Sequence, residues 1–212
     1  MKVAVFAGTG VKTAPDIGIA LERLEVTHEE VNEEDIQESK LLGHDVLVVP
    51  GGYTWLYMPS LGNLGRKRIR SFIAQGGKFI GICSGAYIAP KSVILPSEFN
   101  EVHIGLDIID VEITRARGRG IRKIEIVKPE HPIVSGYYGS IEIYYQNGPL
   151  MKAGHGVEVL AVYETGEGAI LLSSFGKGKV ILFSPHPEGS LHHKVSPIKI
   201  GTLNLLKNSI FF

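Results

Sequence analysis

Short, nearly uninterrupted apolar runs recur through the first half of the chain, and glycine or proline follows most of them. Residues 2–7 end in Gly8-Thr9-Gly10, and residues 44–49 end in Pro50-Gly51-Gly52. Successive apolar residues bounded by turn residues are typical of strands buried on both faces. Between these runs, apolar positions recur at helical spacing. We expect strands at residues 2–7, 25–31, 44–49 and 79–82, and helices at 16–24, from 32 to 38, at 63–75 and from 84.

This alternation of strand and helix, with short glycine-rich connections, predicts an α/β fold with a doubly wound, mostly parallel sheet. In such a sheet, ligands bind in the crevice at the carboxyl ends of the strands. The segments at residues 8–10, 51–52 and 83 all follow strand ends, so we expect them to converge.

From about residue 106 the pattern changes to strands with little helix between them. Gly166-Glu167-Gly168 and Gly176-Lys177-Gly178 separate adjacent apolar runs and predict hairpin turns. We expect an antiparallel region that either continues the parallel sheet or lies beside it, and a closing helix at residues 197–211. No repeat or linker is evident, so we expect one domain over residues 1–212. The expected strands of this half are residues 111–114, 123–127, 141–145, 159–163, 169–172 and 180–183.

Composition narrows the class of protein. Hydrophobic residues make up 44% of the 212 residues, and the 22 basic residues balance the 22 acidic ones. This balance argues against general binding to nucleic acid or to an anionic membrane. A single cysteine cannot form an intramolecular disulfide, which favours a reducing compartment. The N-terminal apolar run is broken by glycine too early for a signal peptide or a membrane span, so we expect a cytoplasmic protein.

Cys83 stands between the apolar run of residues 79–82 and a helical pattern that begins at Ser84. Gly81 and Gly85 flank the cysteine two residues away on either side. This arrangement is typical of a nucleophile elbow, a tight strand-to-helix turn that presents one side chain above the sheet edge. The N–H groups of the following helix favour the thiolate. The alternative is a structural cysteine, because an isolated cysteine is usually buried as a small hydrophobic residue.

A cysteine nucleophile needs a base and a partner that orients the base. The apolar run of residues 180–183 leads into Pro185-His186-Pro187-Glu188, which supplies both. We expect Cys83 to be the nucleophile, His186 the general base and Glu188 the residue that orients the imidazole. Backbone N–H groups would stabilise the oxyanion of an acyl-transfer reaction. The candidate oxyanion and binding residues are Gly51, Gly52 and Ser84.

Other polar features add less to this interpretation. Five cations lie within residues 115–123, where they form either a solvated loop or a pocket for a phosphate or carboxylate. Gly8-Thr9-Gly10 starts like a dinucleotide fingerprint, but Thr13 stands where the third glycine would fall, so we expect an ordinary turn. The histidines, including His192 and His193, lack metal-ligand spacing with Cys83 or the acids. We therefore expect no metal and no cofactor.

Three segments together resemble the class I glutamine amidotransferase superfamily: Pro50-Gly51-Gly52, the elbow at residues 81–85, and His186-Pro187-Glu188. Within it, the chain resembles the N-terminal domain of eukaryotic biotin–protein ligases and its stand-alone microbial relatives. The elbow continues as Ala86-Tyr87, and Tyr144-Tyr-Gln-Asn-Gly148 follows later; both are similar to that subgroup. The resemblance covers nearly the whole chain. It implies a flavodoxin-like fold and acyl transfer by a Cys–His–Glu triad.

Tyr87 departs from the superfamily pattern. Glutaminase domains usually carry glutamine four residues after the nucleophile, and a phenol at this position changes the volume and the hydrogen bonding of the pocket. Glutamine is therefore questionable as the substrate, and we expect a cysteine-dependent amidohydrolase that acts on another small amide or ester. The candidate residues of the substrate pocket are Tyr53, Trp55, Tyr87, Tyr144, Tyr145 and Asn147.

Two other classes of function remain open. A non-enzymatic binding or regulatory module would use the aromatic pocket residues to hold a small ligand or a partner. A redox or glyoxalase-type protein would recruit an acid near the first strand, and residues 7–10 offer none. We also expect the aromatic segment at residues 53–58 to be an exposed loop, which makes it a candidate homodimer contact.

Overall fold

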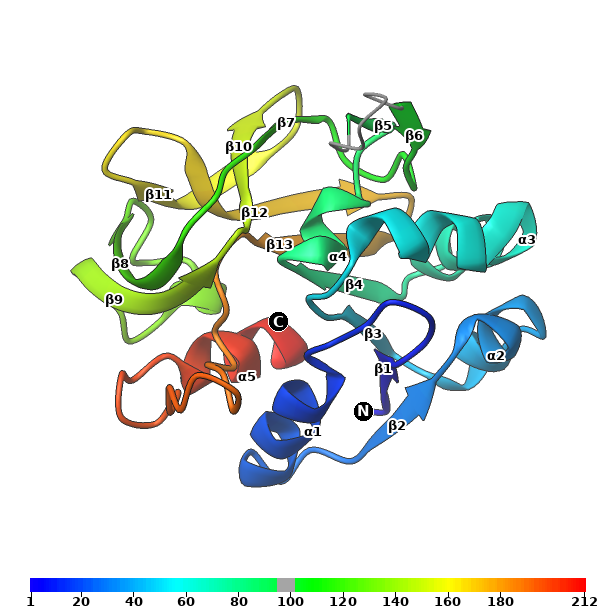
Figure 1. Cartoon of the computed structure of the whole chain (residues 1–212), viewed down its shortest axis with the longest axis horizontal. Helices are drawn as coiled ribbons and strands as arrows, with labels where there is room; N and C mark the ends of the chain where they lie inside the picture. The colour runs from blue at the N-terminus through cyan, green and yellow to red at the C-terminus, as the bar shows by residue number, and fades with distance from the viewer. Residues whose placement is uncertain (95–101) are drawn as a thin grey trace.

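The computed structural model describes residues 1–94 and 102–212. A mixed sheet of eleven strands runs through both halves of this described part (Figure 1). Its first section is parallel and has the order β2-β1-β3-β4-β13. The bounds of these strands are β1 Val3–Phe6, β2 His28–Val31, β3 Val46–Val49, β4 Lys78–Ile82 and β13 Gly178–Phe183.

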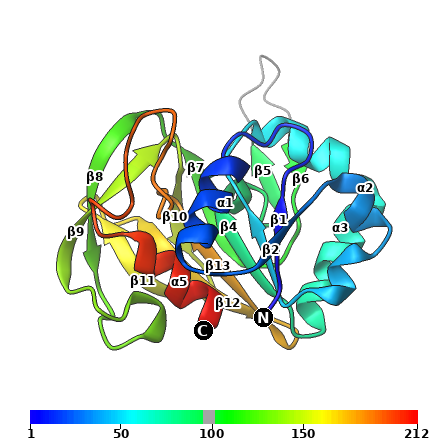
Figure 2. The same cartoon turned by 90° about the horizontal axis from the view of Figure 1, so that it is seen from below.

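Helices cover both faces of the parallel section, as a doubly wound fold requires. Alternate residues of each strand point to opposite faces, so both faces bear apolar side chains. One face packs against α1 (Ala14–Arg23) and α5 (Leu203–Phe211). The other face packs against α2 (Glu33–Gln37) and α3 (Thr54–Ala74). In Figure 2, α1 and α5 lie together in front of the sheet, and α2 and α3 lie at its side.

The start of α3 corrects one expectation. The aromatic segment at residues 53–58 is not a loop, because α3 begins at Thr54 and continues through Pro59 to a kink at Gly62 (φ 58°, ψ −171°). Tyr57, Met58 and Leu61 are buried in the core against the sheet. Packing of this apolar face therefore outweighs the helix-breaking tendency of proline and glycine. The expected helix at residues 63–75 is the part of α3 after the kink.

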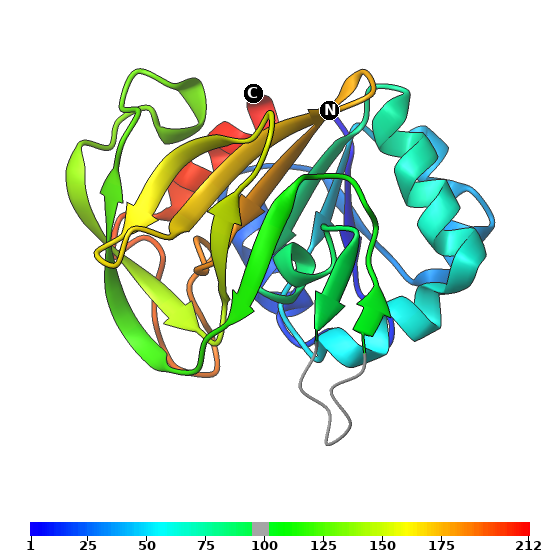
Figure 3. The ribbon, with the colours of Figure 1, turned by 90° about the horizontal axis from the view of Figure 1, so that it is seen from above.

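The antiparallel strands continue the same sheet, which decides between the two alternatives above. β13 pairs with β4 in parallel and with β12 in antiparallel, and the sheet extends from there as β12-β11-β8-β9 (Figure 3). β10 pairs with both β12 and β7. The predicted hairpin turns at Gly166 and Gly176 are confirmed, and both glycines have positive φ. The bounds are β7 Val111–Arg115, β8 Arg119–Ile126, β9 Gly139–Gln146, β10 Pro149–Ala153, β11 Glu158–Tyr163 and β12 Gly168–Phe175.

Several element bounds in this half differ from those expected. The basic segment at residues 115–123 is mostly strand: it contains the last residue of β7, an irregular connection at residues 116–118 and the start of β8. β10 was not predicted, and α5 begins at Leu203 instead of residue 197. The shorter elements that complete the fold are α4 Ser84–Tyr87, the pair β5 Ser92–Ile94 and β6 Val102–Ile104, and the 3-10 turns Lys40–Gly43 and Pro132–Val134. Among the described residues, no helix combines the length and the apolar character needed to cross a membrane.

Candidate active site

The predicted strand-to-helix turn holds Cys83 at the end of β4. Cys83 has φ 52° and ψ −104°, a conformation that L-residues rarely adopt outside functional sites. An ideal Cβ on Gly81 would lie 2.7 Å from the Gly85 carbonyl oxygen, and one on Gly85 would overlap the carbonyl oxygen of Val49. Both glycines are thus required by the close approach of α4 to the strands. α4 is a single turn, so its dipole is weaker than that of a longer helix.

His186 and Glu188 form a buried pair after β13. His186 Nδ1 lies 2.8 Å from Glu188 Oε1, and each residue is 3% exposed. Burial opposes protonation of His186, but the negative charges of Glu188 and of an ionised Cys83 outweigh it and raise the pKa of His186 well above its usual range. The second nitrogen, Nε2, has no hydrogen-bond partner among the described residues. This pair can therefore hold a proton on a fixed imidazole whose far nitrogen is available.

The thiol and the imidazole are not hydrogen-bonded to each other in this conformation. The Cys83 thiol donates to the main-chain oxygen of Gln146 at 3.4 Å. Both Cys83 and His186 nevertheless line the same cavity of about 640 Å³. A rotation of the thiol away from Gln146 is needed before a proton can pass to Nε2.

The candidate oxyanion donors differ in their present partners. The Gly51 N–H donates to Thr13 Oγ1 at 2.9 Å, and the Gly52 N–H donates to Ser84 Oγ at 3.0 Å. Ser84 is the first residue of α4, so its N–H has no acceptor within the helix. Of the three predicted residues, Gly51 and Gly52 have N–H groups bonded to side chains, whereas Ser84 has an N–H without an acceptor in the helix.

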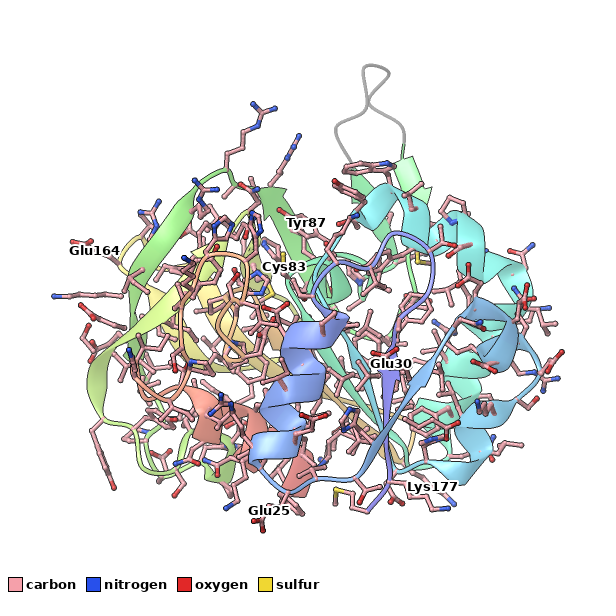
Figure 4. The ribbon with its side chains drawn as sticks, turned by 60° about the horizontal axis from the view of Figure 1, so that its bottom comes forward. Glu25, Glu30, Cys83, Tyr87, Glu164 and Lys177 are labelled. Carbon is pink, nitrogen blue, oxygen red and sulfur yellow. The ribbon has the colours of Figure 1, made fainter. Side chains whose placement is uncertain are left out.

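The cavity brings together most of the predicted site residues. It lies at the carboxyl ends of the parallel strands, where the sequence places it, and the antiparallel half supplies part of its wall. Figure 4 shows Cys83 and Tyr87 near one another in the middle of the molecule, between the two sections of the sheet. Glu188 lies behind His186 and does not line the cavity. The predicted residues in the wall are Gly51, Gly52, Tyr53, Trp55, Cys83, Ser84, Tyr87, Asn147 and His186.

Tyr144 and Tyr145 are the two predicted pocket residues that are not among those lining this cavity. Both are buried, and successive residues of β9 point to opposite faces of the sheet. The Tyr144 ring packs against His186 with 5.6 Å between ring centroids. The Tyr145 hydroxyl donates to the Gly148 carbonyl at 2.8 Å. Tyr144 thus packs against the candidate base, and Tyr145 bonds to the segment between β9 and β10.

Tyr87 and Asn147 connect the two sections of the sheet across the cavity. The Tyr87 hydroxyl donates to the Asn147 main-chain oxygen at 3.2 Å. Burial, with the charge of Cys83, raises the pKa of this phenol, so it stays a neutral donor. Asn147 adopts φ 52°, and its side-chain oxygen accepts the Gly118 N–H at 2.9 Å. Tyr87 therefore fixes the cavity wall opposite the elbow.

Sequence reasoning missed about half of the wall. Arg115 belongs to the basic segment at residues 115–123 and lines the cavity. The other four cations of that segment are not among the lining residues. Residues 12–16 follow β1, and residues 190–193 follow His186, so position after a strand end was the available signal. Among the described residues, no three His, Cys, Asp or Glu side chains are grouped to hold a metal ion. The wall residues that were not predicted are Lys12, Thr13, Asp16, Thr54, Arg115, Gln146, Ser190, His192 and His193.

Comparison with known proteins relates the chain to a family. The family model for the N-terminal part of biotin-protein ligase matches residues 1–109. The pyridoxal 5'-phosphate synthase subunit PdxT of Koribacter versatilis is 31% identical over 144 residues, which is 67% of either chain. PdxT of Geobacillus stearothermophilus is 27% identical over 160 residues, covering 75% of this chain and 76% of the relative.

Solved structures support the same assignment at the level of the fold. A glutamine amidotransferase from Thermotoga maritima superposes with a TM-score of 0.64, covers 99% of this chain and 96% of its own, and is 13% identical. Identity this low shows the fold alone. With the family match and the PdxT relatives, it leads to one conclusion: the chain belongs to the biotin-protein ligase N-terminal family, within the class I glutamine amidotransferase-like superfamily.

Proposed function

We propose that the protein is a cysteine-dependent acyl-transfer enzyme that hydrolyses a small amide or ester. The observation that carries this proposal is the buried His186, whose Nδ1 is paired with Glu188 and whose Nε2 is unpartnered beside the cavity that Cys83 lines. A buried nitrogen without a partner is costly, and such groups are typical of catalytic sites.

The reaction follows from these groups. The Cys83 thiol gives its proton to His186 Nε2, and the thiolate attacks the carbonyl carbon of the substrate. The Ser84 N–H donates to the resulting oxyanion. When the tetrahedral intermediate collapses, the bond to the leaving group breaks and the imidazolium protonates the departing amine or alcohol. His186 then takes a proton from water, which attacks the thioester and releases the acid.

Glu188 has two roles in this scheme. Its carboxylate accepts a hydrogen bond from Nδ1, which leaves Nε2 as the basic nitrogen of the neutral ring. It also stabilises the imidazolium that forms when Cys83 ionises, consistent with the raised pKa of His186.

The rate of Cys83 alkylation by iodoacetamide, measured against pH, tests this proposal. Cys83 is the only cysteine, so mass spectrometry reports on this residue alone. We expect alkylation to persist well below the free thiol value of about 8.5 and to lose this acidic limb in His186→Ala. The Cys83→Ser variant is the unlabelled control. A wild-type rate that simply follows a free thiol would contradict the proposal.

The substrate is tested separately, with glutamine and a panel of small amides and esters. Tyr87 argues for a substrate other than glutamine. Glutamine is included in the panel because the superfamily is that of glutamine amidotransferases. Hydrolysis that is abolished in Cys83→Ala identifies the substrate. Turnover that is unchanged in Cys83→Ala would contradict the assignment of the nucleophile.

A second candidate function is ligand binding without turnover within a larger complex, which the synthase-subunit names of the relatives motivate. The bond between the Cys83 thiol and Gln146, in place of one to His186, favours it. Trp55 is the only tryptophan and is half-exposed at the cavity, 4.9 Å from the Tyr53 ring, so its fluorescence reports on binding there. A compound that binds wild type and Cys83→Ser equally, without being hydrolysed, would support this function over the enzyme.

A further inference from the structure

The Ser84 hydroxyl forms hydrogen bonds with both the N–H and the carbonyl oxygen of Gly52. It donates to the Gly52 carbonyl oxygen at 2.7 Å and accepts the Gly52 N–H at 3.0 Å. Thr54 Oγ1 donates to the same hydroxyl at 3.1 Å. A serine hydroxyl has one donor and two acceptor positions, so all three are filled. Ser84 is 2% exposed and Thr54 is 7% exposed, which keeps water from replacing these bonds.

This arrangement blocks a group that the reaction needs. Gly52 and Cys83 both line the cavity, and the Gly52 N–H is the candidate partner of the Ser84 N–H in holding an oxyanion. While the Ser84 hydroxyl accepts that N–H, Gly52 cannot donate to a substrate oxygen. Removal of one oxyanion donor typically costs a factor of about 100 or more in rate.

We propose that the Ser84 side chain is a gate on the oxyanion site, which closes it at rest and opens when negative charge develops on a bound carbonyl. This inference rests on the proposed acyl-transfer function and adds a regulatory step to it. The gate opens by rotation of the Ser84 side chain, which breaks both bonds to Gly52. No covalent bond changes in this step; the Gly52 N–H exchanges a hydroxyl acceptor for the oxyanion.

The chemistry of the two acceptors explains why the exchange is selective. A hydrogen bond to an oxyanion is roughly twice as strong as one to a neutral hydroxyl. A neutral ligand oxygen therefore gains little by displacing Ser84, whereas the tetrahedral intermediate gains more. Thr54 supports the closed position, because its hydroxyl donates to Ser84 Oγ in the present rotamer. The gate thus favours the transition state over ground-state binding.

The test compares an aldehyde with iodoacetamide on the same cysteine. The Cys83 thiol adds across the carbonyl of propionaldehyde: the C–S bond forms as the C=O π bond breaks. The thiol proton passes to the former carbonyl oxygen, which becomes the hydroxyl of a hemithioacetal at the oxyanion position. Iodoacetamide displaces iodide and creates no such oxygen. Protection of Cys83 by propionaldehyde against alkylation gives the aldehyde dissociation constant, and the unprotected rate reports on the thiolate. The variants are Ser84→Ala, which removes the gate, and Thr54→Val, which removes only its support.

We expect Ser84→Ala to bind propionaldehyde about fivefold more tightly than wild type, the value of one additional hydrogen bond, and Thr54→Val to bind it about twofold more tightly. The unprotected alkylation rate, measured for each variant, separates a change in the reactivity of the thiolate from a change at the oxyanion site. If Ser84→Ala does not fold, Thr54→Val carries the comparison, with Thr54→Ser as the control that keeps the hydroxyl.

Unchanged or weaker aldehyde binding in the gate variants, with alkylation intact, would overturn the gate and leave the proposed function standing. Weaker binding in Ser84→Ala would instead make the hydroxyl an oxyanion donor. A thiol that resists alkylation in wild type and in every variant would overturn the proposed function and the gate together.

Discussion

The two sides of the cavity hold their reactive groups by opposite means. On the side of the elbow, the backbone alone places Cys83: a positive φ, two glycines and the close approach of α4 to Val49. On the other side, side-chain chemistry places His186, through burial and the carboxylate of Glu188. The elbow is therefore expected to be sensitive to added atoms, whereas the imidazole is expected to be sensitive to charge and pH.

The largest expected effect comes from adding one carbon atom to the elbow. In Gly85→Ala the new Cβ would overlap the main-chain oxygen of Val49, which cannot move without disturbing β3. We expect the free energy of unfolding in urea to fall by about 3 kcal/mol or more. Gly43→Ala is the matched control, because nothing lies within 4 Å of a Cβ at Gly43 and its φ is not positive. Equal stability of the two variants would show that the elbow is not fixed by the backbone.

Glu188→Gln tests the other side by removing charge with little change of shape. The raised pKa of His186 means that the folded state binds its proton more tightly than the unfolded chain does. The pair therefore stabilises the fold fully below the unfolded histidine value of about 6.5, and this contribution is lost as pH rises through the folded pKa. In Glu188→Gln the buried imidazole must stay neutral, so we expect a loss of about 2 kcal/mol near pH 5.5 and a smaller loss at alkaline pH.

Unfolding in urea at several pH values measures this difference. Glu158→Gln is the control, because Glu158 forms an ion pair of the same length, 2.8 Å, with Lys128 at a more exposed position. Exposed pairs contribute about 0–1 kcal/mol, so this variant should change little. A loss in Glu188→Gln that does not depend on pH would argue that the pair acts through packing instead of charge.

The smallest expected effect concerns Lys78, a buried cation without a carboxylate of the described residues bonded to it as Glu188 is bonded to His186. Among the described residues, its only hydrogen-bond partner is a main-chain carbonyl. Its Nζ donates to the Ile210 main-chain oxygen at 2.6 Å, and burial lowers its pKa from 10.5 to about 8 despite the opposing charge of Asp45. Between these values the unfolded chain binds the additional proton, so stability rises with pH. We expect a gain on the order of 1 kcal/mol from about pH 8 to about pH 9.5.

The Lys78→Met variant should abolish this rise, as measured by urea unfolding across the same interval. Met keeps the length of the side chain but cannot titrate or donate to Ile210. A rise that persists in Lys78→Met would assign the alkaline stabilisation to another group.

The sequence was most informative where one local rule decided the structure. Strands of the parallel section bear apolar residues on both faces, so the ends of the runs at Val49 and Ile82 were predicted correctly and their starts to within about two residues. The elbow was recognisable because only glycine tolerates the contacts at Gly81 and Gly85. By contrast, Pro59 and Gly62 signal an interruption, and only the tertiary burial of Tyr57 and Leu61 reveals the helix through them.

The cavity wall was predictable only in part, because some of its residues are placed by local sequence and others by tertiary contacts. Residues next to a strand end, such as Gly51 and His186, carry their position in the local sequence. The direction of a side chain in β9 depends on the register with β8 and on the bridge between Tyr144 and His186, and neither is encoded locally. The position of Tyr144 and Tyr145 outside the cavity wall could therefore not be predicted from the sequence. Ser84 was identified through its N–H, but the bonds of its hydroxyl depend on contacts with the α3 region.

The position of β13 has a consequence for biosynthesis. β13 pairs with β4, about 100 residues earlier in the chain, and His186 follows directly after it. Contacts between such distant segments form late, because the intervening loop must be closed first. A nascent chain therefore presents the Cys83 elbow long before it can acquire its base. Any product truncated before β13 would carry a cysteine without its histidine, so the ribosome delivers the complete site only with the last strand of the sheet.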